Sequence, residues 1–181
     1  MSDMFFEVGD KVVYPVHGAG IIEAIENREI LGTIHSYYVL KLCVGEMHVL
    51  VPVDKVESVG MRPVSDREKL DQAIDVLRQE SSSWEENWNK RYRLNMDKIK
   101  SGDICLLAEV VRNLMLHDVA KGLSTGEKKM LDNARKILVS EVVLVANDSM
   151  ENVTNKLNEI VRERSQANFS DLENELEKTK G

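Results

Sequence analysis

Residues 61–77, MRPVSDREKLDQAIDVL, divide the sequence into two parts with different patterns. The stretch contains Pro63, the last proline of the chain. After it, apolar residues recur three and four positions apart, at Leu70, Ala73, Ile74 and Leu77. This spacing places apolar side chains on one face of a helix, and Ser65 with Glu68 three residues later is a capping box that predicts the start of that helix. We therefore expect the fold to change class at this stretch.

The part before this stretch has the pattern of β structure. Four short runs rich in β-branched and aromatic residues, at 8–14, 21–30, 37–44 and 47–51, are separated by glycine-containing turns. Short strands at this spacing predict a small barrel or a strongly bent sheet.

The part after it has the pattern of helices. Ser101-Gly102-Asp103 ends one helix and caps the next, which is expected to reach about residue 121. Ser124 with Glu127 is a further capping box and predicts a helix to about residue 145, and another helix is expected from residue 148. These helices carry enough apolar positions for a compact core.

The most unusual stretch is WEENWNKRYRLNMDKIK, residues 84–100. It spaces Trp84, Trp88 and Tyr92 four residues apart, which would align the three rings on one face of a helix. Such rings can stack on nucleobases while the neighbouring cations hold phosphates, or they can form the buried face of an amphipathic helix. The start of this helix remains open: Ser83 with Glu86 is one possible cap, and Asn87 is another that would leave Trp88 exposed on the first turn.

The distribution of charge bears on these alternatives. The chain of 181 residues has a formal net charge of −7, but the segment 88–136 carries 11 basic and 6 acidic residues, a balance of +5. A local basic surface on an acidic protein can still bind phosphates, weakly and with strong salt dependence.

Other features indicate a globular protein of the cytoplasm. Hydrophobic residues make up 43% and charged residues 30% of the chain, and no apolar run is long enough to span a bilayer. We see no secretory signal at the start, and Cys43 and Cys105 are too isolated for a disulfide framework. No membrane association is expected.

Catalytic motifs are absent from the sequence. The four histidines, at positions 17, 35, 48 and 117, fall in no metal-binding pattern, and there is no nucleophile motif or paired-cysteine motif. The sequence therefore predicts a protein that is not an enzyme and that uses neither a metal ion nor another cofactor.

Four motifs, in order and at consistent spacing, resemble the CarD/CdnL family of bacterial transcription regulators. They are VGDKVVYP at 8–15 with His17-Gly18 after it, NWNKRY at 87–92, SGD at 101–103 and GLSTGEK at 122–128. The first motif also resembles the polymerase-interacting module of transcription-repair coupling factors, so the order of all four carries the specificity. The resemblance covers about residues 4–165.

The resemblance implies a Tudor-like (SH3-like) β-barrel that docks on the β subunit of RNA polymerase, followed by an all-α domain on promoter DNA. A tryptophan would wedge into the minor groove at the upstream edge of the melted bubble and stabilise the open complex. The wedge falls on Trp88, and the basic DNA contacts fall on Lys90, Arg93 and Lys128, with Arg91 assisting. Trp84 lies outside the motif and is expected to pack.

The resemblance also implies a polymerase contact through an exposed strand edge. Arg28 matches a basic contact position. The edge residues are Met47, His48, Val49, Leu50, Val51 and Pro52. Leu50 departs from the pattern, since some members carry arginine there, but pairing through the backbone does not depend on the side chain.

Together these inferences predict a two-module α+β monomer. Residues 1–63 form the Tudor-like polymerase-interaction domain, 64–165 the helical DNA-binding domain, and 166–181 a charged tail with no assigned role. The alternative is a protein–protein adaptor that binds no DNA and keeps Trp88 in its helical core.

Overall fold

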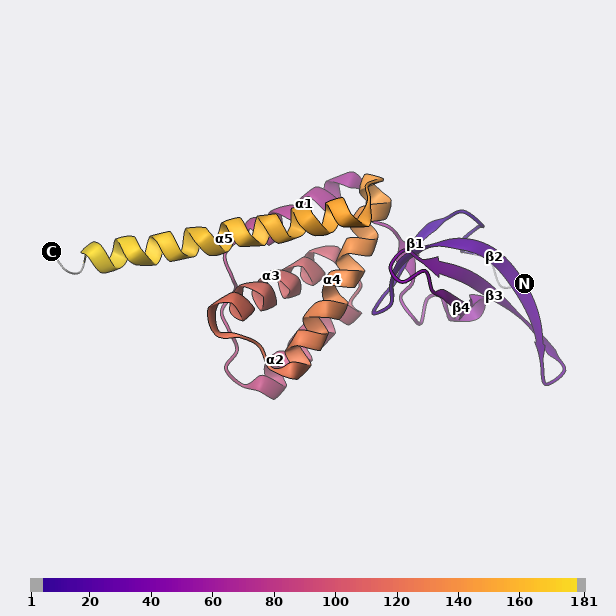
Figure 1. Ribbon diagram of the computed structural model, residues 1–181. Helices are drawn as coiled ribbons and strands as arrows, with labels where there is room; N and C mark the ends of the chain where they lie inside the picture. Colours follow the sequence, from indigo (N-terminus) through magenta and orange to yellow (C-terminus); the bar gives the residue numbers. More distant parts are fainter. Residues whose placement is uncertain (1–4, 179–181) are drawn as a thin grey trace.

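The chain forms a β module followed by a helical module, as Figure 1 shows. The computed structural model describes residues 5–178, with side chains as far as residue 167 and at Ser170. The predicted two-module α+β fold is confirmed, and the change of class falls between Pro63 and Arg67.

The β module is a five-stranded antiparallel sheet with the order β4-β3-β2-β1-β5. Its strands are β1 (Lys11–Tyr14), β2 (Gly18–Ile30), β3 (Thr33–Leu42), β4 (His48–Pro52) and β5 (Arg62–Pro63), and a short 3₁₀ turn, η1 (Val53–Lys55), follows β4. The two-residue strand β5 was not predicted, because a strand that short has no periodicity. The sheet is strongly bent (Figure 1). Within the described residues its two outer strands, β4 and β5, do not pair with each other, so hydrogen bonds do not close it into a barrel.

The hairpin of β2 and β3 is much longer than its neighbours. The two strands pair from Gly20–Leu42 to Ile30–Thr33, whereas β4 reaches only as far as Tyr37. The turn between them uses Leu31 and Gly32, both with positive φ (51° and 78°), which is the backbone that a tight two-residue hairpin requires. The tip of the hairpin therefore projects beyond the rest of the sheet.

In the part of the chain that the structure describes, the helical module packs five helices around its own core. They are α1 (Arg67–Arg78), α2 (Trp88–Lys100), α3 (Ile104–Lys121), α4 (Thr125–Ala146) and α5 (Met150–Lys178). Leu77, Ile104, Leu114 and Leu138 are fully buried at its centre. The long helix α5 extends past the other helices and crosses residue 166 without a break, so the predicted tail does not begin with a change of structure.

Local capping signals were reliable at α4 and wrong at α1. Ser124 and Glu127 form the predicted capping box, with both reciprocal hydrogen bonds present. Ser65 was predicted to cap α1, but the cap is Asp66, whose carboxylate accepts a hydrogen bond from the Lys69 amide. Ser65 does not cap α1 because a carboxylate of α4 binds it.

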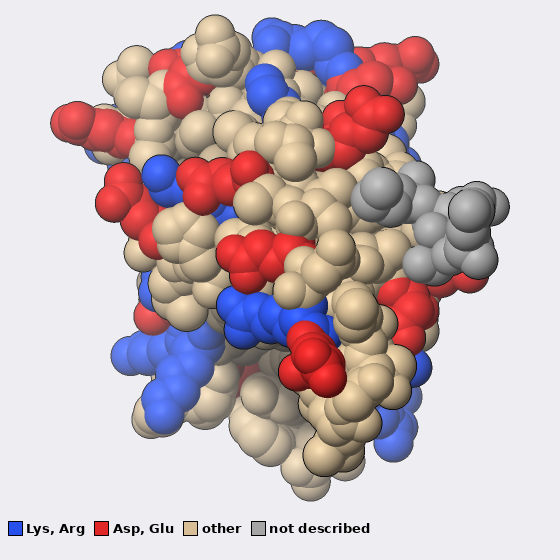
Figure 2. Space-filling model, turned by 90° about the vertical axis from the view of Figure 1, so that its right-hand side faces the viewer, with Lys and Arg blue, Asp and Glu red and all other residues tan. Residues whose placement is uncertain are grey.

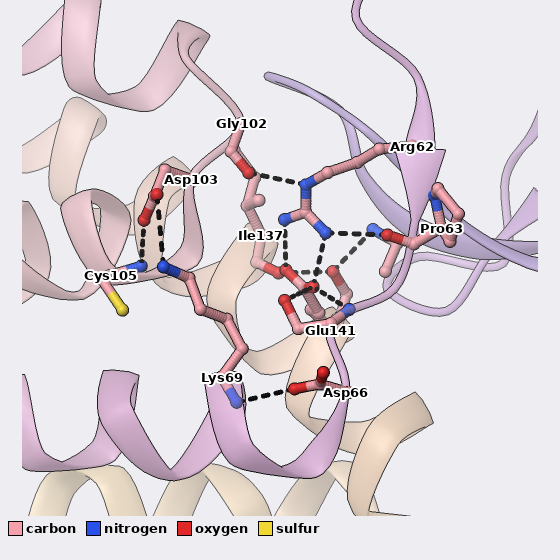
Figure 3. A network of polar contacts seen from close by, with 12 residues as sticks. Arg62, Pro63, Asp66, Lys69, Gly102, Asp103, Cys105, Ile137 and Glu141 are labelled. Atoms are coloured by element: carbon pink, nitrogen blue, oxygen red, sulfur yellow. Dashed lines mark hydrogen bonds and ion pairs between the residues drawn. The ribbon is translucent and has the colours of Figure 1, made fainter.

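That carboxylate belongs to Glu141 of α4, which is completely buried. Figure 3 shows Arg62 of β5 donating to both oxygens of Glu141, at 2.8 and 2.9 Å, while its Nε donates to the Gly102 carbonyl at 2.7 Å. The amide and hydroxyl of Ser65 donate to Oε1 of Glu141, at 2.8 and 2.7 Å. Every polar atom of the buried carboxylate therefore has partners, which offset the cost of its burial.

A second set of contacts joins α4 to the sheet. The Ala19 amide donates to the Ser140 hydroxyl at 2.8 Å, and the Lys11 ammonium donates to the Leu144 carbonyl at 3.1 Å. A Cβ on Gly18 would lie 3.1 Å from the same hydroxyl, so a glycine there permits the close approach of β2 and α4. Val13, Ala19 and Leu144 form a small apolar cluster at this junction. The two modules are thus held in one relative orientation.

No helix among the described residues is long and apolar enough to cross a membrane. Cys43 and Cys105 are both free and half-buried.

Candidate functional site

Trp88 is the first residue of α2 and lies at the surface. The Asn87 side chain caps the helix by accepting a hydrogen bond from the Lys90 amide at 3.0 Å, so the second of the two possible starts is correct. Trp88 is 41% exposed, and its ring stacks on Tyr92 with the centroids 5.1 Å apart. A large aromatic ring is therefore presented to solvent on a fixed helical turn.

The edge of this ring lies against the beginning of α4. The indole Nε1–H of Trp88 donates to the Ser124 hydroxyl at 3.0 Å. A Cβ on Gly126 would lie only 3.3 Å from ring carbon Cζ2, so the ring rests directly on the backbone of the first turn. The structure thus brings together two of the sequence motifs, at 87–92 and 122–128.

Trp84 has a different environment and does not continue the stripe. It precedes the helix, stacks on His117 of α3 at a centroid distance of 3.5 Å, and packs against the helical core. The predicted alignment of three rings on one helix face is therefore wrong, because the cap at Asn87 starts the helix after Trp84. The expectation that Trp84 packs is confirmed.

Arg91 points into the structure. Its Nε donates to Oε1 of Glu127 at 2.7 Å in an ion pair whose side chains are only 12% and 4% exposed. Burial alone would raise the pKa of Glu127, but hydrogen bonds from Arg91 and Ser124 outweigh it and hold the pKa below its ordinary value. The guanidinium also lies over the Trp84 ring, 4.3 Å from its centroid. These contacts occupy Arg91 within the protein.

The other predicted basic residues are exposed. Lys90 follows Trp88 and pairs with Glu85 at 2.6 Å, Arg93 lies one turn further along α2, and Lys128 lies on the first turn of α4. Lys90 and Arg93 therefore lie on the same helix as Trp88, and Lys128 lies on the first turn of α4, which the indole contacts.

The predicted docking segment contains an edge strand. In the described part of the chain, β4 pairs with β3 alone, and Met47 precedes the strand. The Leu42 amide donates to the Met47 carbonyl at 2.9 Å, which sets the alternation of hydrogen bonds along the pair. Val49 and Val51 accordingly bond to β3, whereas the backbone groups of His48 and Leu50 point outward.

Side chains along this edge differ in exposure: Val51 is fully buried and Val49 and Pro52 are half-buried, whereas the others are exposed. Leu50 is 37% and Met47 is 61% exposed. His48 contacts Glu23 at 2.7 Å. Arg28 lies on the projecting hairpin beyond the end of β4, where it forms an exposed pair with Glu26 at 3.0 Å. The edge thus offers both backbone groups and side chains to a partner.

Two known domain families match successive parts of this chain. The CarD-like/TRCF RID domain matches residues 6–65, and the CarD C-terminal domain matches residues 72–158. YdeB of Bacillus subtilis (strain 168), a protein provisionally named a transcription factor, is 44% identical over 140 residues, which cover 77% of this chain and 92% of YdeB.

The chain belongs to the CarD/CdnL family of bacterial transcription regulators. Its two modules therefore correspond to the two domains of a CarD-family protein, with a Tudor-like β module at the N-terminus and the exposed Trp88 in the C-terminal domain.

The surface of the CarD-like β module carries charges of both signs. Figure 2 looks at this end of the molecule and shows basic and acidic side chains interspersed with a broad neutral area. Among the described side chains, no three His, Cys, Asp or Glu residues gather closely enough to hold a metal ion. The β4 edge and the Trp88 indole are both exposed to solvent.

Proposed function

We propose that this protein docks on the β subunit of RNA polymerase through the β4 edge and stabilises the open promoter complex with Trp88. It acts as a monomer and without catalysis. The observation that carries the proposal is the contrast between the two tryptophans: Trp84 is partly buried against the helical core, whereas Trp88, the residue in the family motif, is 41% exposed.

On the DNA side, the indole supplies a flat apolar surface at the upstream edge of the bubble. Unstacking a base step costs a few kcal/mol, so the ring gains most where the duplex is already opened, and a stacked aromatic contributes about 1–3 kcal/mol. Lys90, Arg93 and Lys128 would contact the adjacent phosphates. Arg91, being buried, supports this surface from within through Glu127.

On the polymerase side, the outward backbone groups of His48 and Leu50 would pair with a strand of the β subunit. The rest of the segment from Met47 to Pro52 surrounds them, and Arg28 adds a cation from the hairpin. A balance of +5 over residues 88–136 is too small for tight independent binding to DNA. Docking on polymerase would compensate by raising the effective concentration of the protein at the promoter.

The adaptor alternative required Trp88 in the helical core. Trp88 is instead exposed and makes its contacts at the surface, with Tyr92, Ser124 and Gly126. The exposure of Trp88 therefore supports the proposed function over that alternative.

The test is the lifetime of open complexes formed by polymerase on promoter DNA with Trp88→Ala. We expect a lifetime about tenfold shorter, equivalent to about 1.4 kcal/mol, with thermal stability and polymerase binding nearly unchanged. Leu94→Ala is the matched control, since it truncates another apolar residue of α2 that is 44% exposed. An unchanged lifetime with Trp88→Ala would reject the proposal.

A further inference from the structure

The Ser124 hydroxyl serves two structures at once. It accepts a hydrogen bond from the Glu127 amide at 3.3 Å, as the cap of α4, and donates to the Glu127 carboxylate at 2.8 Å. The same oxygen accepts the indole N–H of Trp88 at 3.0 Å. The orientation of the exposed ring is thus tied to the cap of a neighbouring helix.

The position of this hydroxyl is itself fixed from the interior. Glu127 is 3% exposed and is held by the Arg91 guanidinium at 2.7 Å. Arg91 in turn donates to the Glu85 carbonyl at 2.6 Å and covers the Trp84 ring. A continuous series of polar contacts therefore runs from the segment before α2, through the buried ion pair, to the indole nitrogen.

Two further contacts restrict the ring. Tyr92 stacks on one face with an interplanar angle of 26°, and Gly126 lies beneath the edge that carries Nε1 and Cζ2. The exposed part of Trp88 is turned away from these contacts. An indole held in this way loses little conformational freedom when it inserts into DNA, which is the advantage of preorganisation.

We propose that Ser124 is a positioning residue for Trp88: its hydroxyl holds the indole in the orientation that enters the DNA. The inference rests on the proposed function. Ser124 makes no contact with DNA in this account and acts through the indole alone.

The experiment compares Ser124→Gly with Ser124→Thr. Glycine removes the acceptor for the indole but is nearly as good a helix cap as serine, whereas threonine keeps both the acceptor and the cap. All variants carry Trp84→Phe, which leaves Trp88 as the single tryptophan, since the chain contains two. Time-resolved fluorescence anisotropy then reports the mobility of the Trp88 ring alone.

We expect Ser124→Gly to increase the fast depolarisation of Trp88 and to shorten the open-complex lifetime by roughly two- to tenfold, the range that one hydrogen bond supports. Ser124→Thr should restore both. Asp103→Gly is the matched control, because Asp103 caps α3 beyond the far end of α2. It should leave the mobility of Trp88 unchanged.

The outcomes separate this inference from the proposed function. Unchanged anisotropy in Ser124→Gly overturns the positioning role whatever happens at the promoter. A lifetime shortened by Trp88→Ala but not by Ser124→Gly overturns the inference and leaves the proposed function intact. A lifetime insensitive to Trp88→Ala rejects the proposed function itself.

Discussion

Arg62 and Glu141 are 79 residues apart in sequence and form a bidentate ion pair, with hydrogen bonds of 2.8 and 2.9 Å, in which the carboxylate is completely buried. Arg62 belongs to the last strand of the β module and Glu141 to α4. The pair therefore fastens one module to the other at the point where the chain passes between them.

Glu141→Gln should destabilise the protein strongly. A neutral amide leaves the Arg62 charge without its partner, and breaking a buried pair costs about 3–5 kcal/mol, with the lower value expected here because Arg62 is 28% exposed. Urea unfolding measures the loss. Asp75→Asn, which breaks an exposed pair with Arg78, should cost at most about 1 kcal/mol. Equal losses in the two variants would contradict the structural role of Glu141.

The two tryptophans should differ in their effect on stability. Trp84→Ala removes a ring that packs against the core and stacks on His117, so we expect a loss of about 3 kcal/mol in the free energy of unfolding. Trp88→Ala removes an exposed ring and should cost about 1 kcal/mol or less. Denaturant titrations of both variants decide the point, and a larger loss for Trp88→Ala would place that ring in the core.

Gly126→Ala should separate stability from function. Alanine suits a helix better than glycine by about 0.4–1 kcal/mol, so the gain in stability should be at most that much once the crowding of the Trp88 ring is included. The added methyl would lie 3.3 Å from the Trp88 ring and should displace it, which shortens the open-complex lifetime. Melting curves and lifetimes are measured together. Thr125→Ala, at an exposed position in the same turn, is the control and should leave the lifetime unchanged.

Leu50→Pro should prevent docking on the polymerase β subunit while the β module stays folded. Proline removes an outward N–H of β4 that β3 does not use, a position where edge strands tolerate it. Leu50→Ala keeps the N–H and should keep most of the binding. Val49→Pro removes a bond to β3 and should disrupt the sheet. A pull-down with a parallel circular dichroism measurement distinguishes these cases, and full binding by Leu50→Pro would move the contact elsewhere.

Mild acid should weaken the helical module through His117. Burial lowers the pKa of His117, and the cations Lys121 and Arg91 lower it further. The folded state therefore binds the proton less readily than the unfolded state, so stability is complete above the ordinary pKa of about 6.5 and declines as the pH falls below it. His117→Phe keeps the stack on Trp84 without titrating. Its melting temperature should fall less than that of the parent between pH 7 and pH 5.

The sequence predicted the local features of the fold better than the contacts between distant segments. Ser124 and Glu127 cap α4 as their spacing indicates, because both partners lie within one turn. Ser65 has the same spacing to Glu68, yet its hydroxyl binds Glu141 and Asp66 becomes the cap. A local pattern contains no information about a competing partner 76 residues away.

The same limit applies to the candidate site. The motif identified Trp88, and the structure shows it exposed, but the four-residue spacing wrongly aligned Trp84 with it. The sequence predicted Arg91 as a cation of the basic surface. In the structure its side chain is only 12% exposed, because it pairs with Glu127 of another helix. The sequence predicted Ser124 only as a helix cap. Its hydrogen bond to the indole joins residues 36 positions apart, which no local pattern indicates.

The helix α4 holds the indole at its beginning, through Ser124, and the β module near its end, through Ser140 and Glu141. From Ser124 to Glu141 a helix rises about 25 Å, at 1.5 Å per residue, or about seven base-pair steps of 3.4 Å. Under the proposed function, the length of α4 sets the distance between the polymerase-bound β module and the DNA-contacting indole. One inserted residue would turn its two ends by about 100° relative to each other, so its length is constrained more tightly than its surface composition.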